Sequence, residues 1–324
     1  MKIQPLKIRK LKIRKKEKRA ARDGTHRKKR RLIHIAVLPS FITLMNGACG
    51  FIAMVFASRS QELNVSFFLM RRSSLTNFAL AGYMIILAML ADVLDGRVAR
   101  LTRTTSSFGG QLDSLSDAIS FGAAPAFLMA KLLEFQIAHN SFRHLPFSIL
   151  IWRGVFFSAI FYAMCAVVRL ARFNVENEED ESAHMNFAGL PSPAAAGILV
   201  SLVIIHQQLM PRIAALAPNG VHVFETATII ALPITTFFAG ILMVSRIRYP
   251  HLANQLLRGK KPLSSLLLLF ACGLLVVWNI QLSMVVGFCG FALFGVLRWV
   301  FLSIKGAIAK GRDNANQPRD ALHP

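Results

Sequence analysis

The stretch ADVLDGRVARLTRTTSSFGGQLDSLSDA, residues 91–118, carries four aspartates between two segments that are apolar enough to cross a membrane. Ionisable side chains at membrane depth are costly unless they face a bundle interior, a charged partner or a cavity, so they usually mark a functional site. Asp92 and Asp95 fall on the first of these segments, and Asp113 and Asp117 fall on the second. The sequence therefore predicts a helical hairpin with a polar, functional face.

The spacing of these residues predicts that the carboxylates converge. Residues three and four apart share one face of an α-helix. Each helix of the hairpin then has a face that combines carboxylates with small residues: Asp92, Asp95, Gly96 and Ala99 on the first, and Gly109, Asp113 and Asp117 on the second. Clustered carboxylates repel one another, and a hard divalent cation such as Mg²⁺ or Mn²⁺ relieves that repulsion. The two faces together predict a metal site.

The composition indicates a membrane protein with a basic N-terminal arm. The chain is 54% hydrophobic with a mean hydropathy of +0.48, yet its formal net charge is +22. Residues 1–34 hold sixteen of the 38 lysines and arginines, so the charge and the apolar runs are separate. A polybasic segment before a membrane span sets topology and attracts anionic lipid headgroups. We therefore expect the arm to face membrane lipid, and we expect no nucleic-acid partner.

Eight apolar segments have about the length that is needed to cross a bilayer. They lie near residues 35–57, 78–97, 109–132, 155–172, 191–209, 223–244, 263–280 and 282–301. The sequence thus predicts an all-α integral membrane protein with about eight transmembrane helices. We divide it into a basic arm (1–34), a transmembrane domain that carries the aspartates (35–250), two additional transmembrane helices (251–304) and a polar tail (305–324).

The distribution of basic residues predicts the orientation in the membrane. When the N-terminus is placed inside, the inside segments hold 30 lysines and arginines and the outside segments hold seven. Basic residues accumulate on the cytoplasmic side of membrane proteins. Both termini, and the turn that joins the two aspartate helices, are therefore expected to be cytoplasmic.

The aspartate stretch resembles the signature of the CDP-alcohol phosphotransferases. It reads Asp92-x-x-Asp95-Gly96-x-x-Ala99-Arg100, then eight residues, then Gly109-x-x-x-Asp113-x-x-x-Asp117. Members of this family are membrane enzymes that transfer a substituted phosphate from a CDP-activated donor to an alcohol. The resemblance implies this reaction class and dependence on Mg²⁺ or Mn²⁺.

Three further stretches are similar to one branch of that family, the integral-membrane bacterial phosphatidylserine synthases. They are LPSFITLMNGACGF at 38–51, RLARFN at 169–174 and FAGLPSPAAAG at 187–197. The branch transfers a phosphatidyl group from CDP-diacylglycerol to the hydroxyl of L-serine and releases CMP. The resemblance covers most of residues 35–250, and it implies a six-helix catalytic core, a homodimer and a place in the bacterial cytoplasmic membrane.

The resemblance also implies a role for each matching residue. The metal ligands would be Asp92, Asp95, Asp113 and Asp117, of which Asp117 would also act as the general base. The CDP-lipid would be bound by Asp92, Gly96, Ala99, Arg100 and Gly109. Arg169 and Arg172 are candidates for binding the serine carboxylate or the donor phosphates.

Two other functions stay open at this point. A related transferase could use glycerol phosphate, inositol phosphate or choline as its acceptor, but it should not need the stretch at 187–197. A cation transporter could use the carboxylates as part of an ion path. Against that reading, no other predicted span offers a matching relay of acidic residues to continue such a path across the bilayer.

Overall fold

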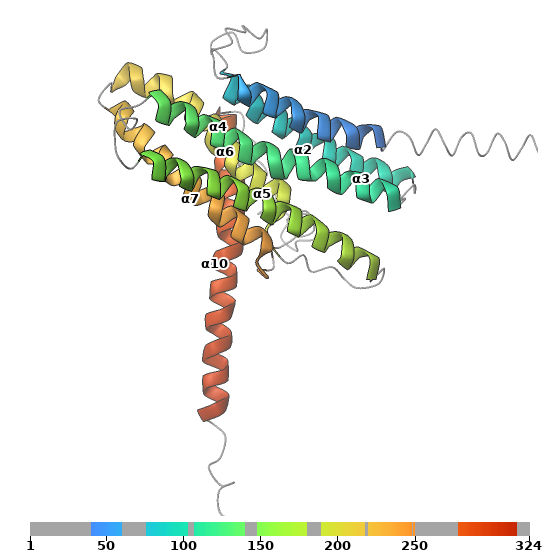
Figure 1. Cartoon of the computed structure of the whole chain (residues 1–324). Coiled ribbons are helices and arrows are strands. Elements are labelled where there is room, and N and C mark those ends of the chain that lie inside the picture. Colours follow the sequence, from blue (N-terminus) through green and yellow to red (C-terminus); the bar gives the residue numbers. More distant parts are fainter. Residues whose placement is uncertain are drawn as a thin grey trace, which may run out of the picture.

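The computed structural model describes residues 40–59, 76–102, 107–139, 148–179, 189–217, 220–247, 249 and 278–315, and the regular structure within these ranges is entirely helical (Figure 1). An N-terminal helix, Ser40–Ser58, precedes the labelled elements. These are α2 (Asn77–Thr102), α3 (Ser107–Asp117), η1 (Ala118–Ala123), α4 (Ala124–His139), α5 (Ser148–Glu179), α6 (Ser192–Leu216), α7 (Gly220–Val244) and α10 (Ile280–Ala315). The all-α prediction is confirmed.

Seven of the described helices are long and apolar enough to cross a membrane. They are Ser40–Ser58, Asn77–Val98, Phe108–Ala138, Ile149–Val175, Ser192–Leu216, Gly220–Val244 and Ile280–Lys305. Each overlaps one predicted span. The remaining predicted span, 263–280, lies almost wholly outside the described residues, and the basic arm at 1–34 lies wholly outside them. The sequence underestimates several helix lengths, because a helix continues past its apolar segment wherever polar helix-forming residues follow.

The third span changes its backbone hydrogen bonding directly after Asp117. Here α3 passes into η1, a wide π-helical segment, which in turn passes into α4. Such π segments are rare within helices and are frequently found at functional sites. Ser120, Phe121 and Gly122 of η1 are buried against the rest of the bundle. The irregular segment therefore adjoins the second aspartate pair.

The N-terminal helix, blue in Figure 1, packs very closely on this segment. A Cβ added to Gly50 would lie only 2.7 Å from the Cα of Ser120, so no larger residue fits without moving a backbone. Beside this contact, the Ser120 hydroxyl donates a hydrogen bond of 2.8 Å to the backbone carbonyl of Asn46. Small residues allow this kind of close approach between membrane helices. The contact brings the side chain of Asn46 toward Asp117.

The central helix is α6, which contacts α2, α4, α5, α7, η1 and α10. It begins at Ser192 after Pro191, in agreement with the tolerance of proline for the start of a helix. The preceding turn is fixed to the end of α7 and to the residues just after it, because the Leu190 amide donates to the Leu242 carbonyl and the Gly189 amide donates to the Ile247 carbonyl, both at 2.9 Å. Gly189 has a φ of 93°, a conformation that other residues rarely adopt. This turn holds the beginning of α6 in place.

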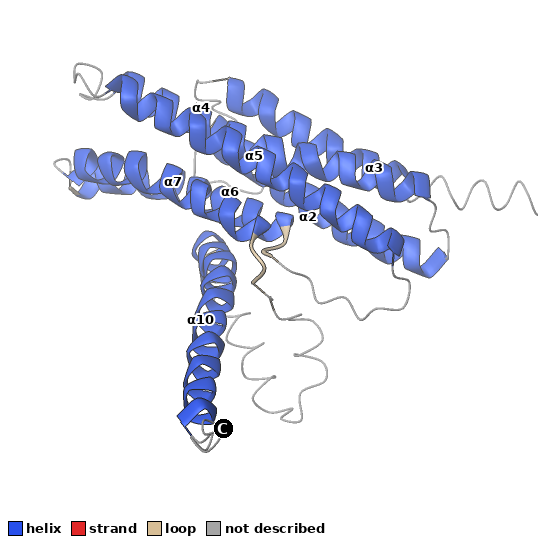
Figure 2. Ribbon diagram, turned by 60° about the horizontal axis from the view of Figure 1, so that its bottom comes forward, coloured by secondary structure: helices blue, strands red, loops and turns tan. Residues whose placement is uncertain are grey.

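Helix α10 runs across the direction of the other helices and extends beyond the bundle (Figures 1 and 2). Its N-terminal half packs on α6, where the ring of Phe288 occupies the space that a side chain at Gly197 would fill. Gln281 near its start donates a hydrogen bond of 3.2 Å to the Tyr83 hydroxyl of α2. These contacts attach α10 to the bundle beside the beginning of α6.

Candidate functional site

Three of the four aspartates converge at the end of the bundle where α2 stops and α3 starts. Carboxylate oxygens of Asp92, Asp113 and Asp117 all lie within 4.8 Å of one another. Asp92 comes from α2, whereas the other two come from α3, where their spacing of four places both on one face, as the sequence predicts. Asp117 is buried and the other two are half-buried.

This arrangement suits a divalent cation. Three carboxylates at such separations repel strongly wherever water is partly excluded. Hard cations such as Mg²⁺ and Mn²⁺ take oxygen ligands of this kind, and their charge offsets the repulsion. The three side chains therefore form a group that can hold a metal ion.

Asp95 lies outside this group of three. Its side chain is 7% exposed, and the Thr43 hydroxyl donates a hydrogen bond to its Oδ2 atom. Its Oδ1 atom is buried and has no hydrogen-bond partner within the part of the chain that the structure describes. A buried carboxylate oxygen without a partner is unfavourable. Asp95 thus keeps one oxygen that a cation could satisfy.

Two side chains of the N-terminal helix, Thr43 and Asn46, hold the carboxylates, and the sequence analysis assigned them no role. The Asn46 amide nitrogen donates to the Asp117 Oδ1 atom at 2.9 Å, and the Asn46 side chain is fully buried. Thr43 makes the corresponding contact to Asp95. The sequence did contain a signal for this role: Thr43 and Asn46 are polar residues one helical turn apart on an otherwise apolar span.

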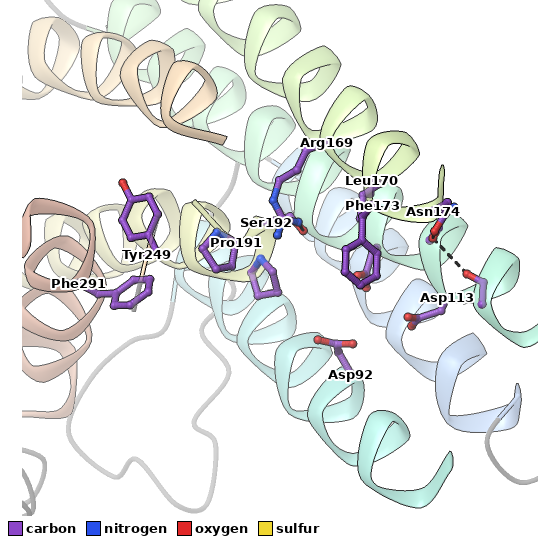
Figure 3. Close-up of a pocket in the computed structure, with 14 residues that line it drawn as sticks. Asp92, Asp113, Arg169, Leu170, Phe173, Asn174, Pro191, Ser192, Tyr249 and Phe291 are labelled. Carbon is purple, nitrogen blue, oxygen red and sulfur yellow. Dashed lines mark hydrogen bonds between the residues drawn. The ribbon is translucent and has the colours of Figure 1, made fainter. Parts of the chain in front are cut away.

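A cavity of about 400 Å³ opens beside the carboxylates (Figure 3). Its lining comes from α2, α3, α5, the beginning of α6, α10 and the isolated residue 249: Asp92, Gly110, Asp113, Ser114, Asp117, Arg169, Leu170, Phe173, Asn174, Pro191, Ser192, Pro193, Tyr249 and Phe291. Two of the three stretches that are similar to the branch, 169–174 and 187–197, therefore contribute to the same cavity as the aspartates.

Arg169 is the basic residue of this lining. Its Nη1 atom donates a hydrogen bond of 2.9 Å to the Ser192 hydroxyl, and its buried Nε atom has no partner among the described residues. Nearby, the Ser114 hydroxyl donates to the Asn174 Oδ1 atom at 2.8 Å and joins α3 to α5 (Figure 3). Arg172 is half-buried one turn beyond Arg169, but it is not part of the described lining.

The residues expected to bind the CDP-lipid lie around the ends of α2 and α3. A Cβ added to Gly96 would meet nothing within 4 Å, so this face of α2 is open. Gly109 is half-buried one turn before Asp113. Ala99 and Arg100 belong to the last turn of α2, but their side chains lie outside the described part of the structure. The open glycine face leaves room for a ligand to approach the helix backbone closely.

Comparison with known proteins identifies the class. Residues 36–237 match the model of the CDP-alcohol phosphatidyltransferase family, so the chain belongs to this family. The matched segment contains the whole aspartate signature, and it ends before Tyr249 and α10. Together with the seven apolar helices, family membership makes the chain an integral membrane phosphotransferase. The transporter alternative is thereby set aside.

Individual relatives point to one reaction. A CDP-diacylglycerol–serine O-phosphatidyltransferase of Helicobacter pylori is 33% identical over 228 residues, which cover 70% of this chain and 83% of the relative. An enzyme with the same name from Methanocaldococcus jannaschii is 30% identical over 223 residues, 68% of this chain and 78% of the relative. Another from Saccharomyces cerevisiae is 33% identical over 185 residues, 56% of this chain and 57% of the relative.

The contact between Asn46 and Asp117 gives a first prediction. Asn46→Ala should lower the turnover of the enzyme about tenfold, since a hydrogen bond to a charged group contributes roughly 1.5–3 kcal/mol. Turnover is measured as CMP release per folded protein in detergent. Asn77→Ala is the matched control, because Asn77 is also buried but donates to the Arg59 carbonyl, away from the cavity. Equal losses in both variants would show that Asn46 has no special relation to the carboxylates.

Proposed function

We propose that this protein transfers the phosphatidyl group of CDP-diacylglycerol to the hydroxyl of L-serine, giving phosphatidylserine and CMP. One observation carries the proposal: the aspartate group and two of the three stretches typical of phosphatidylserine synthases, 169–174 and 187–197, line a single cavity. The names of the relatives support the choice of serine as acceptor. The cavity thus combines a place for a diphosphate with a place for an amino acid.

The metal site would use all four aspartates. Asp92, Asp113 and Asp117 would supply the converging oxygens, and Asp95 would add its unpartnered Oδ1 atom. A bound Mg²⁺ or Mn²⁺ would neutralise charge on the diphosphate and on the departing CMP. The donor would also contact the residues that the signature assigns to it: Asp92, Gly96, Ala99, Arg100 and Gly109.

Asp117 would act as the general base. Its Oδ1 atom accepts a hydrogen bond from Asn46, which leaves Oδ2 for the proton of the serine hydroxyl. As the serine oxygen forms its bond to the phosphatidyl phosphorus, the bond from that phosphorus to CMP breaks and the proton passes to Asp117. A general base usually accelerates a reaction about 10²- to 10⁴-fold, so the positioning of the substrates and the metal must supply the rest of the rate acceleration.

Arg169 would bind the carboxylate of serine. Its guanidinium lines the cavity, the Ser192 hydroxyl fixes one of its nitrogens, and its Nε donor has no partner among the described residues. Planar guanidinium groups are well suited to carboxylates. Arg172, one turn further along α5, is the second candidate and would bind the donor phosphates or support Arg169.

We further propose that the site faces the cytoplasm of a bacterial cell, in the inner membrane, with both chain termini on the same side. The excess of basic residues in the segments on that side supports this orientation. A cytoplasmic site would give soluble serine direct access to a donor that lies in the membrane. The resemblance to the family supports a homodimer as the working assembly.

The reaction is tested with purified protein in detergent, CDP-diacylglycerol, Mg²⁺ or Mn²⁺, and radiolabelled serine or glycerol 3-phosphate. We expect metal-dependent CMP release with labelled phosphatidylserine as the lipid product, and no product from glycerol 3-phosphate. Removal of the metal with a chelator should abolish product, and its return should restore it. Product from glycerol 3-phosphate alone would keep the transferase chemistry but contradict serine as the acceptor.

The role of Arg169 gives a separate prediction about substrate affinity. Arg169→Ala should raise the KM for serine at least about tenfold, because a charge-assisted hydrogen-bonded contact is lost. Arg153→Ala is the control, since Arg153 is exposed on the same helix and does not line the cavity. The KM values for serine and for CDP-diacylglycerol are measured in parallel. A rise in the KM for the donor alone would assign Arg169 to the phosphates instead.

A further inference from the structure

The cavity has two chemically different ends (Figure 3). The carboxylates of Asp92 and Asp113 lie at one end. The aromatic rings of Tyr249 and Phe291 lie at the other, with their centroids 5.4 Å apart and their planes inclined by 39°. Arg169 reaches toward Ser192 between them. A ligand that fills the cavity therefore contacts carboxylates at one end, a guanidinium in the middle and aromatic rings at the other end.

The aromatic end is a packed part of the protein. Tyr249 is only 7% exposed, and its ring occupies the space that a side chain at Gly295 of α10 would need. Phe291 lies on the same helix, one turn before Gly295, beside the buried Ala292. The packing of α10 on α6, together with its hydrogen bond to α2, holds α10 in this position. We call the pair Tyr249 and Phe291 the aromatic wall.

The aromatic wall comes from a part of the chain beyond the family match, which ends at residue 237. The aspartate signature therefore does not account for it. Beyond Phe291, α10 continues with exposed apolar side chains such as Phe294 and Leu297. In a membrane protein such side chains face lipid. The wall thus belongs to a helix that continues with an exposed apolar surface.

A CDP-activated lipid has parts that match both ends of the cavity. Its diphosphate requires the carboxylate end and the bound cation, and its cytidine has room along the open face of α2 at Gly96. The acyl chains must extend away from the diphosphate in a direction other than that of the cytidine. The aromatic wall offers the apolar contact on the opposite side of the cavity.

We infer that Tyr249 and Phe291 bind the acyl chains of the donor close to the glycerol, so that α10 forms part of the lipid-binding site. The inference rests on the proposed function for the identity of the donor. It assigns to the C-terminal helix a role in donor affinity that the aspartates and Arg169 do not supply. Apolar contact of this kind discriminates between a lipid-linked nucleotide and the nucleotide alone.

The test compares two ligands that differ in the lipid part. Binding of CDP-diacylglycerol and of CMP to the purified full-length protein is measured at equilibrium in detergent with Mg²⁺, in the absence of serine. Phe291→Ala should weaken CDP-diacylglycerol binding at least about tenfold, as loss of an apolar pocket contact usually does. CMP binding should stay unchanged, which also shows that the variant is folded. Phe291→Leu should recover most of the affinity for the lipid.

Phe301→Ala is the control, because Phe301 is exposed further along α10 and is not part of the cavity lining. Wild-type affinity for CDP-diacylglycerol in Phe291→Ala, or an equal loss in Phe301→Ala, would overturn the inference. An equal loss of CMP affinity would overturn it too, since the wall would then bind the cytosine. Neither ligand involves serine, so a protein that binds the donor but makes no phosphatidylserine would contradict only the proposed reaction.

Discussion

Three carboxylates lie within 4.8 Å of one another inside a helical bundle that is built to cross a membrane. Like charges at this distance repel, and the low polarity of the surroundings strengthens the repulsion. The cost is acceptable only if a cation compensates it and if the helices are prevented from moving apart. The close packing around Asp117 prevents the helices from moving apart, and the converging carboxylate oxygens are suited to binding a cation.

The restraint comes from contacts between small and polar residues. Gly50 allows the N-terminal helix to approach the backbone of Ser120, and this approach brings Asn46 within hydrogen-bond distance of Asp117. Thr43 holds Asp95 from the same helix. In a membrane bundle, where apolar side chains gain little by leaving lipid, such contacts specify how helices pack. The site is therefore held by neutral donors, which leave the carboxylate charge available for a cation.

The sequence predicted the hairpin and the meeting of Asp92, Asp113 and Asp117 because these depend on local helix periodicity and one short turn. It did not assign roles to Thr43 and Asn46, since their partners lie far along the chain and depend on how helices pack. It also did not predict that Asp95 would face Thr43, or that α10 would run across the bundle. An apolar segment specifies that a helix enters a membrane environment, but not which helix it packs against.

The central claim is that the converging aspartates hold a divalent cation, and Mn²⁺ binding followed by electron paramagnetic resonance tests it most directly. Adding purified protein should lower the resonance signal of free Mn²⁺ because the protein binds the ion. Asp113→Asn should weaken this binding at least about tenfold through the loss of one charged oxygen ligand. Glu134→Gln is the control, because Glu134 is an exposed acid paired with Lys131. Mn²⁺ binding as tight in Asp113→Asn as in the wild type would contradict the claim.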